Sequence, residues 1–204
     1  MTRDGVRQGL AQLVSDTAFY TTALVLRRAT SLVTFPILVR YLTLREFGAL
    51  AVLGTLQELL GVVLQVGVPN AADRFYFDCR TEGERRRLLG TLFVLLMAVS
   101  LAASLGLLWL GPWLWTRVVR DVPFHPLVSL TVVTAFLSGI AVLPRSLFRV
   151  TNRVPLFTAL TAGQAALTAG LSLLLVAGLG LGVLGAVLAN LGAAAVFFSC
   201  SPLV

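Results

Sequence analysis

Runs of about 20 apolar residues recur along the chain, and they limit its fold more than any other feature does. A helix rises 1.5 Å per residue, so roughly 20 residues cross the hydrocarbon core of a bilayer, which is about 30 Å thick. Runs bounded by charge, proline or glycine therefore predict about six transmembrane helices, with bounds good to a few residues. The expected helices cover residues 16–38, 49–68, 88–110, 127–143, 154–176 and 179–198.

Composition supports a membrane rather than a soluble fold. Charged residues make up 12% of the chain and hydrophobic residues 57%, whereas about a quarter of the residues in a soluble domain are charged. No soluble segment separates the apolar runs, and no cleavage site of a signal peptide follows the first one. We expect an all-α, polytopic membrane protein in which residues 1–204 form one bundle of helices.

The arginines predict how the helices are oriented, because positively charged loops stay in the cytoplasm. With a cytoplasmic amino terminus, ten arginines fall in inner segments: Arg3, Arg7, Arg74, Arg80, Arg85, Arg86, Arg87, Arg145, Arg149 and Arg153. Four fall in outer segments: Arg40, Arg45, Arg117 and Arg120. Both termini are expected on the cytoplasmic side.

Two local patterns around the third helix agree with that orientation. Thr81 and Glu84 have the spacing of a capping box, which would start a helix just before three consecutive arginines. The tryptophans lie near the other end of this helix, as an aromatic belt at the outer interface requires: Trp109, Trp113 and Trp115. The loop around residues 74–87 should then face the cytoplasm.

Polar residues within the first two helices are the best candidates for a binding site. On insertion scales an arginine at the centre of a membrane helix costs about 2.5 to 3.5 kcal/mol, and the first helix holds Arg27 and Arg28. In the second helix, Gln57 and Glu58 belong to a stripe that also contains Gly54, Gly61 and Gln65. In an antiparallel helix pair Arg28 and Glu58 would lie at similar depth, close enough for a salt bridge or a shared water.

The remaining residues give little support for catalysis, a cofactor or a metal. There is no catalytic triad, phosphate loop or dinucleotide fingerprint, so we do not expect an enzyme. His125 has no metal-ligand partner at a suitable spacing, and Cys79 and Cys200 form no CxxC pair. The arginines sit in short loops rather than on a continuous basic surface, which argues against nucleic acid despite the net charge of +7.

Small residues near the carboxyl end predict close helix packing. They are Gly178, Gly182, Gly185, Ala189 and Gly192, and Asn190 among them could form an interhelical hydrogen bond.

Several stretches, in this order and spacing, are similar to a known family. Arg28 precedes Pro36 by eight residues, and Val39-Arg40-Tyr41-Leu42-Thr43-Leu44-Arg45-Glu46-Phe47-Gly48 follows. Then come Arg74-Phe75-Tyr76-Phe77, Arg85-Arg86-Arg87-Leu88-Leu89 and the glycine-rich run Gly180-Leu181-Gly182-Val183-Leu184-Gly185-Ala186. The chain resembles the polysaccharide biosynthesis proteins, the O-antigen type flippases of the multidrug/oligosaccharidyl-lipid/polysaccharide exporter superfamily.

The resemblance implies a two-lobed exporter in which cationic side chains hold the diphosphate of a polyprenyl-linked saccharide. Arg28 matches an arginine of the family's first helix, and Arg74 matches one that ends the second helix. Family members usually have twelve or more helices, so this chain corresponds to the amino-terminal lobe and would be a truncated half. The resemblance further implies a bacterial inner membrane location and a role in cell-surface polysaccharide or lipopolysaccharide biosynthesis.

Three functions remain open from the sequence. The first is a flippase of lipid-linked oligosaccharide, with a substrate-binding set of Arg27, Arg28, Glu58, Gln57 and Arg74. The second is a scaffold without transport activity in a polysaccharide assembly complex, and the third is a cation-coupled drug exporter. The expected partners are the bilayer, the polyprenyl-diphosphate-linked saccharide, and either a second six-helix lobe, another copy of the chain or polysaccharide assembly proteins.

Overall fold

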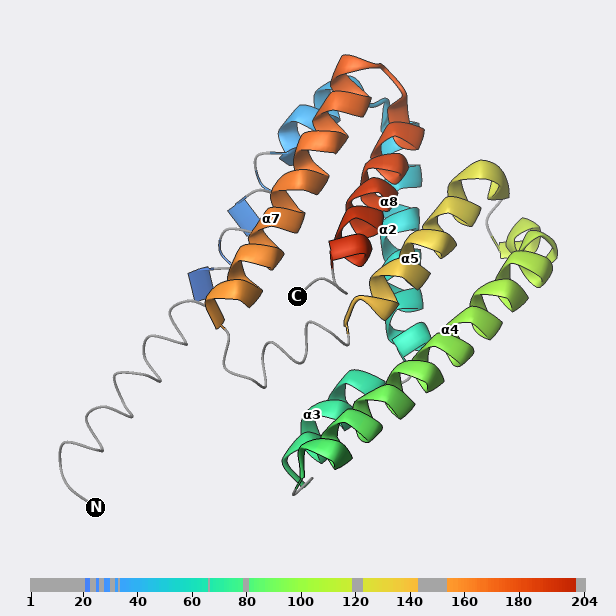
Figure 1. The fold of residues 1–204 in the computed structure, drawn as a ribbon. Helices are drawn as coiled ribbons and strands as arrows, with labels where there is room; N and C mark the ends of the chain where they lie inside the picture. Colours follow the sequence, from blue (N-terminus) through green and yellow to red (C-terminus); the bar gives the residue numbers. More distant parts are fainter. Residues whose placement is uncertain are drawn as a thin grey trace.

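A computed structural model shows a bundle of long antiparallel helices (Figure 1). It describes residues 21–22, 25, 28–29, 32, 34–65, 67–78, 81–118, 123–142 and 154–200. Residues 34–41 are helical, and the elements that follow are α2 (Leu44–Gln65), α3 (Val68–Asp78), α4 (Glu82–Val118), the short π-helical segment η1 (Phe124–Val128), α5 (Ser129–Ile140), α7 (Val154–Leu173), η2 (Leu174–Gly178) and α8 (Gly182–Cys200).

Four of the described helices are long and apolar enough to cross a membrane. They cover Leu44–Gln65, Glu82–Trp115, Thr158–Gly178 and Gly182–Ser199, and Phe124–Ile140 is a shorter apolar helix. No strand occurs in the described part of the chain. The protein is therefore an all-α, polytopic membrane protein.

Two helices begin with a capping box. At the start of α4, the backbone N–H of Thr81 donates to Glu84 Oε2 and the N–H of Glu84 donates to Thr81 Oγ1, each over 3.3 Å. This confirms the box expected from the sequence. At the start of α2, the N–H and hydroxyl of Thr43 both donate to Glu46 Oε2 over 2.8 Å, and the N–H of Glu46 donates to Thr43 Oγ1 over 3.3 Å. These bonds satisfy donors that a helix start leaves without partners.

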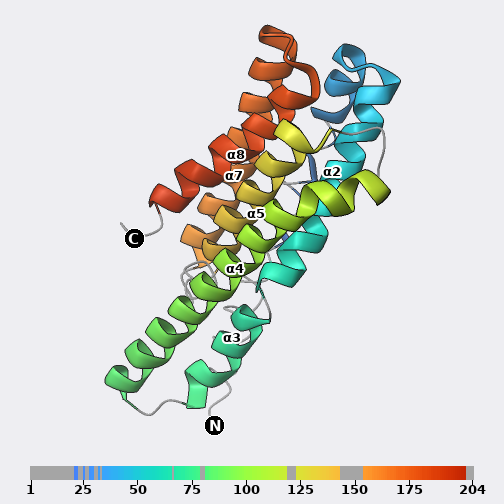
Figure 2. The ribbon, with the colours of Figure 1, turned by 90° about the vertical axis from the view of Figure 1, so that its right-hand side faces the viewer.

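The structure corrects the segment that the sequence analysis treated as a loop. Residues 74–78 belong to α3, and α4 already begins at Glu82. A break separates α3 from α2, because Gly67 adopts a φ of 70°, which ends the regular helix. The chain therefore forms a bent arm at this end, in which α3 lies beside the beginning of α4 (Figure 2).

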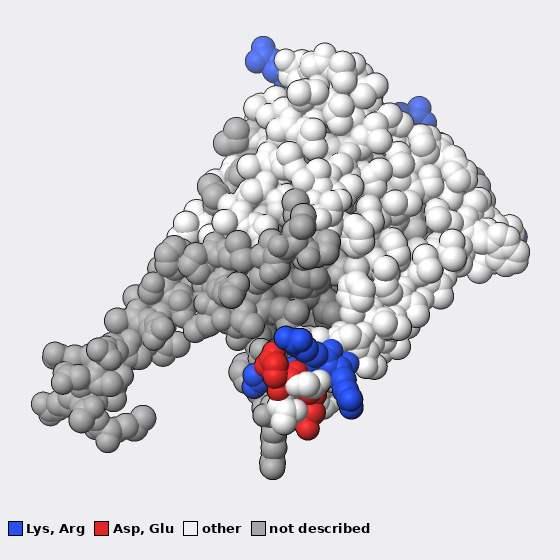
Figure 3. All heavy atoms as spheres, in the orientation of Figure 1, with Lys and Arg blue, Asp and Glu red and all other residues white. Residues whose placement is uncertain are grey.

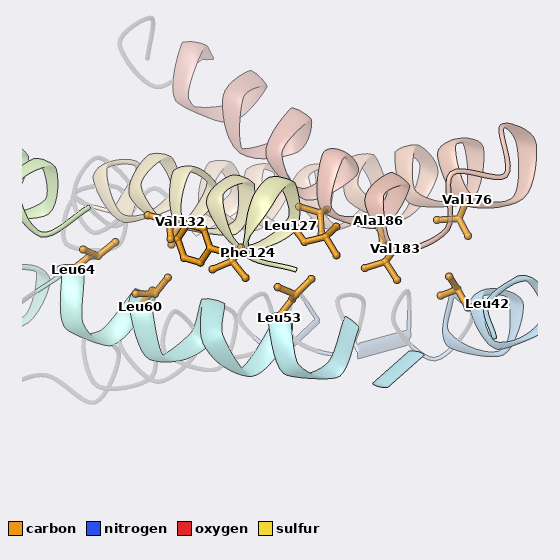
Figure 4. Packing of buried hydrophobic residues seen from close by; sticks show 13 residues of the cluster. Leu42, Leu53, Leu60, Leu64, Phe124, Leu127, Val132, Val176, Val183 and Ala186 are labelled. Atoms are coloured by element: carbon orange, nitrogen blue, oxygen red, sulfur yellow. The ribbon is translucent and has the colours of Figure 1, made fainter. Parts of the chain in front are cut away.

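The main core lies between α2, α5 and α8 (Figure 4). It contains Leu42, Leu53, Leu60, Leu64, Phe124, Leu127, Val128, Val132, Ala135, Val176, Val183, Ala186 and Val187. Helix α5 packs against α2, α4 and α8, while α7 packs against α8. A second group, here called the satellite cluster, joins Val68 and Ala72 of α3 to Leu92, Phe93 and Leu96 of α4.

Large apolar side chains also cover the outside of the bundle. Leu44, Val62 and Trp109 are 91%, 75% and 82% exposed, which water would penalise and lipid would not. In Figure 3 the charged atoms gather where α3 ends and α4 begins, and a broad uncharged surface lies above them. This distribution is what a hydrocarbon layer around the middle of the molecule requires.

The glycines of the last two helices only partly pack as expected. A Cβ on Gly185 would lie 3.0 Å from the Leu175 carbonyl, so close helix packing at this position is confirmed. Gly178, in contrast, has no atom within 4 Å of such a Cβ. Asn190 does not bridge two helices by its amide N–H, because Asn190 Nδ2 donates to Ala186 O of its own helix over 3.2 Å.

Candidate functional site

Helix α2 has an apolar face and a polar face. Leu53, Leu60 and Leu64 point into the main core. The stripe of Gly54, Gln57, Glu58, Gly61 and Gln65 lies away from them, and Glu58 is exposed while Gln57 and Gln65 are half-buried.

No described helix covers this stripe closely. A Cβ on Gly54 would meet no atom within 4 Å, and one on Gly61 would meet only Gln65 Nε2, at 3.9 Å. Tight helix packing over these two glycines, expected from the sequence, is therefore not seen among the described residues. The stripe instead presents a carboxylate and two amides to whatever borders α2 on this side.

The arginines of the first helix have a less complete description. Arg27 lies outside the described residues, whereas Arg28 is helical and exposed. No ion pair joins the Arg28 guanidinium to the Glu58 carboxylate in the part of the chain that the structure describes. The direct salt bridge between these two side chains is thus absent from this conformation.

The resemblance matched Arg74 to the arginine that ends the family's second helix, and the structure places Arg74 on α3 rather than on α2. It lies within α3, beyond the break at Gly67, and its side chain is exposed. Sixteen positions separate it from Glu58 in the sequence (74 − 58), roughly four helical turns. The structure brings Gln57 and Glu58 together on α2 and places Arg74 at the charged end of the molecule.

A contact that the sequence analysis missed joins the start of α2 to the start of α8. The Oε2 atom of Glu46 caps Thr43, while its Oε1 lies against Gly182. Gly182 has a φ of 56°, a conformation that side chains other than glycine's rarely adopt. A carboxylate here also faces the positive end of α8. The Thr-x-x-Glu spacing would have revealed the cap, but not the contact with α8.

The end of α4 opposite its charged start has the features of a membrane interface. Trp109 and Trp113 are exposed, and the Arg117 guanidinium lies 4.4 Å from the centre of the Trp113 ring. Such a pair places a cation over an aromatic face at headgroup depth. The pair lies about nine turns from Glu82, so α4 links two polar zones across the apolar one.

No metal site is found among the described residues. They contain no group of three His, Cys, Asp or Glu side chains that could hold a metal ion. His125 packs edge-on against the ring of Phe124, with the ring centres 5.0 Å apart. The polar stripe along α2 is therefore the candidate site among the described residues.

Comparison with known proteins agrees with this architecture. The family model of polysaccharide biosynthesis proteins matches residues 13–201. A search of curated proteins and a search of solved structures gave no match. The family match extends over nearly the whole chain and includes the Thr43–Glu46 cap, the stripe on α2 and the glycine-rich turn before α8. The chain therefore belongs to the polysaccharide biosynthesis protein family and is a membrane protein of polysaccharide biosynthesis.

Proposed function

We propose that this chain forms one lobe of a flippase that moves a lipid-linked oligosaccharide across the bacterial inner membrane. The polar stripe of α2 and the arginines of the first helix would line the path of the polar headgroup. The protein would transport its substrate without converting it chemically.

One observation carries the proposal: Glu58 is exposed within a helix that is long and apolar enough to span the membrane. Its position is about 5 Å from the middle of α2, near the centre of the hydrocarbon. Insertion scales put the cost of a central charge at about 2.5 to 3.5 kcal/mol. Ionisable groups at such depth generally face a protein interior or a water-filled cavity and mark a transport path.

Arginine suits the headgroup of the proposed substrate. A guanidinium group donates two parallel hydrogen bonds to a phosphate and stays charged at any physiological pH. Arg28 is exposed on the first helix, and its neighbour Arg27 completes a pair of cations for a diphosphate. Glu58 and Gln57 would then contact the sugar hydroxyls or balance the cations, and Arg74 would meet the headgroup at the charged end of the molecule.

A second lobe would complete the path. Alternating access in two-lobed transporters depends on two bundles that rock about a site between them. The uncovered stripe on α2 gives the first bundle a surface for that site. The charged start of α4 and the tryptophans at its other end support a cytoplasmic location for both termini.

The other two functions are less well supported. In a scaffold the stripe on α2 would serve packing only, and Glu58 would need a partner side chain, which the described residues do not supply. In a cation-coupled drug exporter the cavity should be acidic, whereas the first helix carries two adjacent arginines.

Charge-neutralising substitutions test the proposal in cells whose surface polysaccharide depends on this protein. The variants are Arg27→Gln, Arg28→Gln and Glu58→Gln, and Arg28→Lys keeps the charge without the bidentate geometry. Glu82→Gln is the matched control, because Glu82 is an exposed carboxylate at the charged start of α4, where it lies 3.7 Å from the Arg85 guanidinium.

We expect the three membrane variants to lose most polysaccharide export at normal protein levels, Arg28→Lys to lose part of it, and Glu82→Gln to behave like the parent. Accumulation of lipid-linked saccharide on the cytoplasmic side would accompany the loss. Normal export by all three membrane variants would reject transport along this face and favour the scaffold.

A further inference from the structure

Three exposed arginines lie where α3 runs beside the start of α4. They are Arg74 of α3 and Arg86 and Arg87 of α4. None of the three forms an ion pair with a carboxylate in the part of the chain that the structure describes. Figure 3 shows the charged atoms gathered at this end of the molecule. The three guanidinium groups are therefore available to a ligand outside the chain.

The carboxylates at the start of α4 are already engaged within the protein. Glu84 Oε2 accepts a hydrogen bond in the capping box, and Glu82 Oε2 lies 3.7 Å from Arg85 Nη1. Both carboxylates belong to the first turn of α4, whereas Arg86 and Arg87 follow in the next turn and border the apolar run. Along the helix, the acidic groups thus lie farther from the apolar zone than the two exposed arginines do.

The three arginines lie at similar heights along the two helices. Figure 2 shows α3 and α4 antiparallel and side by side, and the satellite cluster joins residues 68–72 to residues 92–96. Counted from the middle of that contact at 1.5 Å per residue, Arg74 lies about 6 Å toward the charged end and Arg87 about 10 Å. The two positions differ by about one helical turn, so the long side chains can reach the same level.

This level is the edge of the hydrocarbon. Helix α2 contains 22 residues, so it is about 33 Å long and crosses the hydrocarbon by itself, and α3 continues the chain beyond it. On α4 the apolar run begins directly after Arg87, and Val94 within that run is 66% exposed. Phospholipid phosphates lie just outside the hydrocarbon, and a guanidinium group donates two parallel hydrogen bonds to a phosphate.

We propose that Arg74, Arg86 and Arg87 form a binding site for the headgroup of an anionic phospholipid from the surrounding bilayer. An anionic lipid surface attracts each nearby arginine by about fivefold in affinity. A zwitterionic lipid offers the same phosphate together with a cation that the arginines repel, so the site selects a headgroup with a net negative charge. The site does not rest on the proposed transport function, and Arg74 holds a bilayer phosphate when no transported lipid is present.

Quenching of a single tryptophan by brominated phospholipids tests the site with the whole chain in nanodiscs of phosphatidylcholine. The three natural tryptophans are replaced by phenylalanine. Gly90→Trp places the reporter on α4 near the level of Arg74, at an exposed position where a Cβ would meet no atom within 4 Å. Phe75→Trp is a second reporter on α3, where the phenylalanine is 47% exposed, and it decides the test if Gly90→Trp does not fold. Brominated phosphatidylglycerol and brominated phosphatidylcholine are compared at equal mole fractions.

We expect brominated phosphatidylglycerol to quench the reporter more strongly than brominated phosphatidylcholine. Each of Arg74→Gln, Arg86→Gln and Arg87→Gln should lower the relative affinity for phosphatidylglycerol by up to about fivefold, and the triple variant should abolish the preference. Arg117→Gln is the matched control, because Arg117 is an exposed arginine at the opposite end of α4, and it should leave the preference unchanged.

Equal quenching by the two lipids would overturn the proposal. A preference that persists in the triple variant, or that falls as much in Arg117→Gln, would also overturn it. Inorganic pyrophosphate and sodium chloride of the same ionic strength are added in separate samples. If only pyrophosphate removed the preference, the arginines would belong to a diphosphate ligand, and the bilayer lipid would be rejected. Translocation is not measured in nanodiscs, so failure of this site and failure of the proposed transport are distinguished.

Discussion

The contact between Glu46 and Gly182 makes a sharp prediction about two nearby glycines. Gly180 and Gly182 both have a positive φ, 64° and 56°. A Cβ on Gly180 would meet no atom within 4 Å, whereas one on Gly182 would collide with the Glu46 carboxylate. Substitution of either glycine by alanine therefore introduces the same backbone strain, and only Gly182→Ala also displaces a neighbour.

The expected loss of stability in each variant follows from the shared backbone strain and from the collision in Gly182→Ala. An alanine in the left-handed region costs about 1 to 2 kcal/mol, and this cost is common to both variants. In Gly182→Ala the flexible carboxylate must turn away, which removes its two bonds to Thr43, the carboxylate half of the capping box, at a cost of about 1 kcal/mol. Gly182→Ala should thus be less stable than Gly180→Ala by about 1 kcal/mol.

Unfolding of the purified chain in mixed micelles, followed by circular dichroism against the fraction of denaturing detergent, would measure these stabilities. The same assay is applied in a double-mutant cycle, with Glu46→Ala alone and combined with each glycine variant. In the Glu46→Ala background the collision and the carboxylate's bonds to Thr43 are both absent, so the extra loss in Gly182→Ala should disappear. Equal losses in the two glycine variants, or an extra loss that persists without Glu46, would refute the reasoning.

Other predictions test the packing and the topology. Gly111→Ala should destabilise the bundle by about 1 to 3 kcal/mol, because its Cβ would lie 2.7 Å from two ring carbons of Phe124. Gly106→Ala is the control in the same helix: its Cβ would meet no atom within 4 Å, so it should stabilise the bundle by up to about 1 kcal/mol in the same unfolding assay. A reporter fused at Glu84 should be active only on the cytoplasmic side, and periplasmic activity would contradict the proposed orientation. The chain reconstituted alone in liposomes should not move a fluorescent polyprenyl-diphosphate saccharide, and measurable translocation would show that no second lobe is needed.

The fold class could be predicted from the sequence because the lipid imposes it. A span of about 20 apolar residues in lipid must satisfy its own backbone hydrogen bonds, so it folds as a helix. The charged and aromatic residues at the ends of α4 mark where the hydrocarbon stops. The capping box at Thr81 could also be predicted, because its two partners are only three residues apart in the sequence. The same spacing at Thr43 would have placed the start of α2 at Leu44 instead of residue 49.

Features that depend on distant residues could not be predicted. Just before the break at Gly67, the carbonyl of Leu64 accepts a hydrogen bond from Ser100, which is 36 positions away from Leu64 in the sequence. The local pattern around Arg74 therefore indicated a loop rather than α3. Asn190 had a carbonyl available in its own helix, and composition cannot tell that bond from an interhelical one. For the candidate site, the periodicity of α2 predicted a stripe that contains Gln57 and Glu58, and the structure shows Glu58 exposed and Gln57 half-buried on that helix. The depth argument for Arg28 gave its height in the membrane but not its lateral distance from Glu58.

Helix α4 contains 37 residues, so it is about 55 Å long, whereas the hydrocarbon core is about 30 Å thick. Even a strong tilt leaves part of it outside the lipid, and its first two turns carry Glu82, Glu84, Arg85, Arg86 and Arg87. One helix therefore passes through both water and lipid, and Pro112, which has no N–H, interrupts its hydrogen bonds only near the far end. The amide protons of the first turns should exchange with heavy water whenever a single turn opens. The amide protons of the apolar middle should stay protected even when their hydrogen bonds open, because no water reaches them. The exchange profile along α4 would thus record the depth of the membrane as well as the stability of the helix.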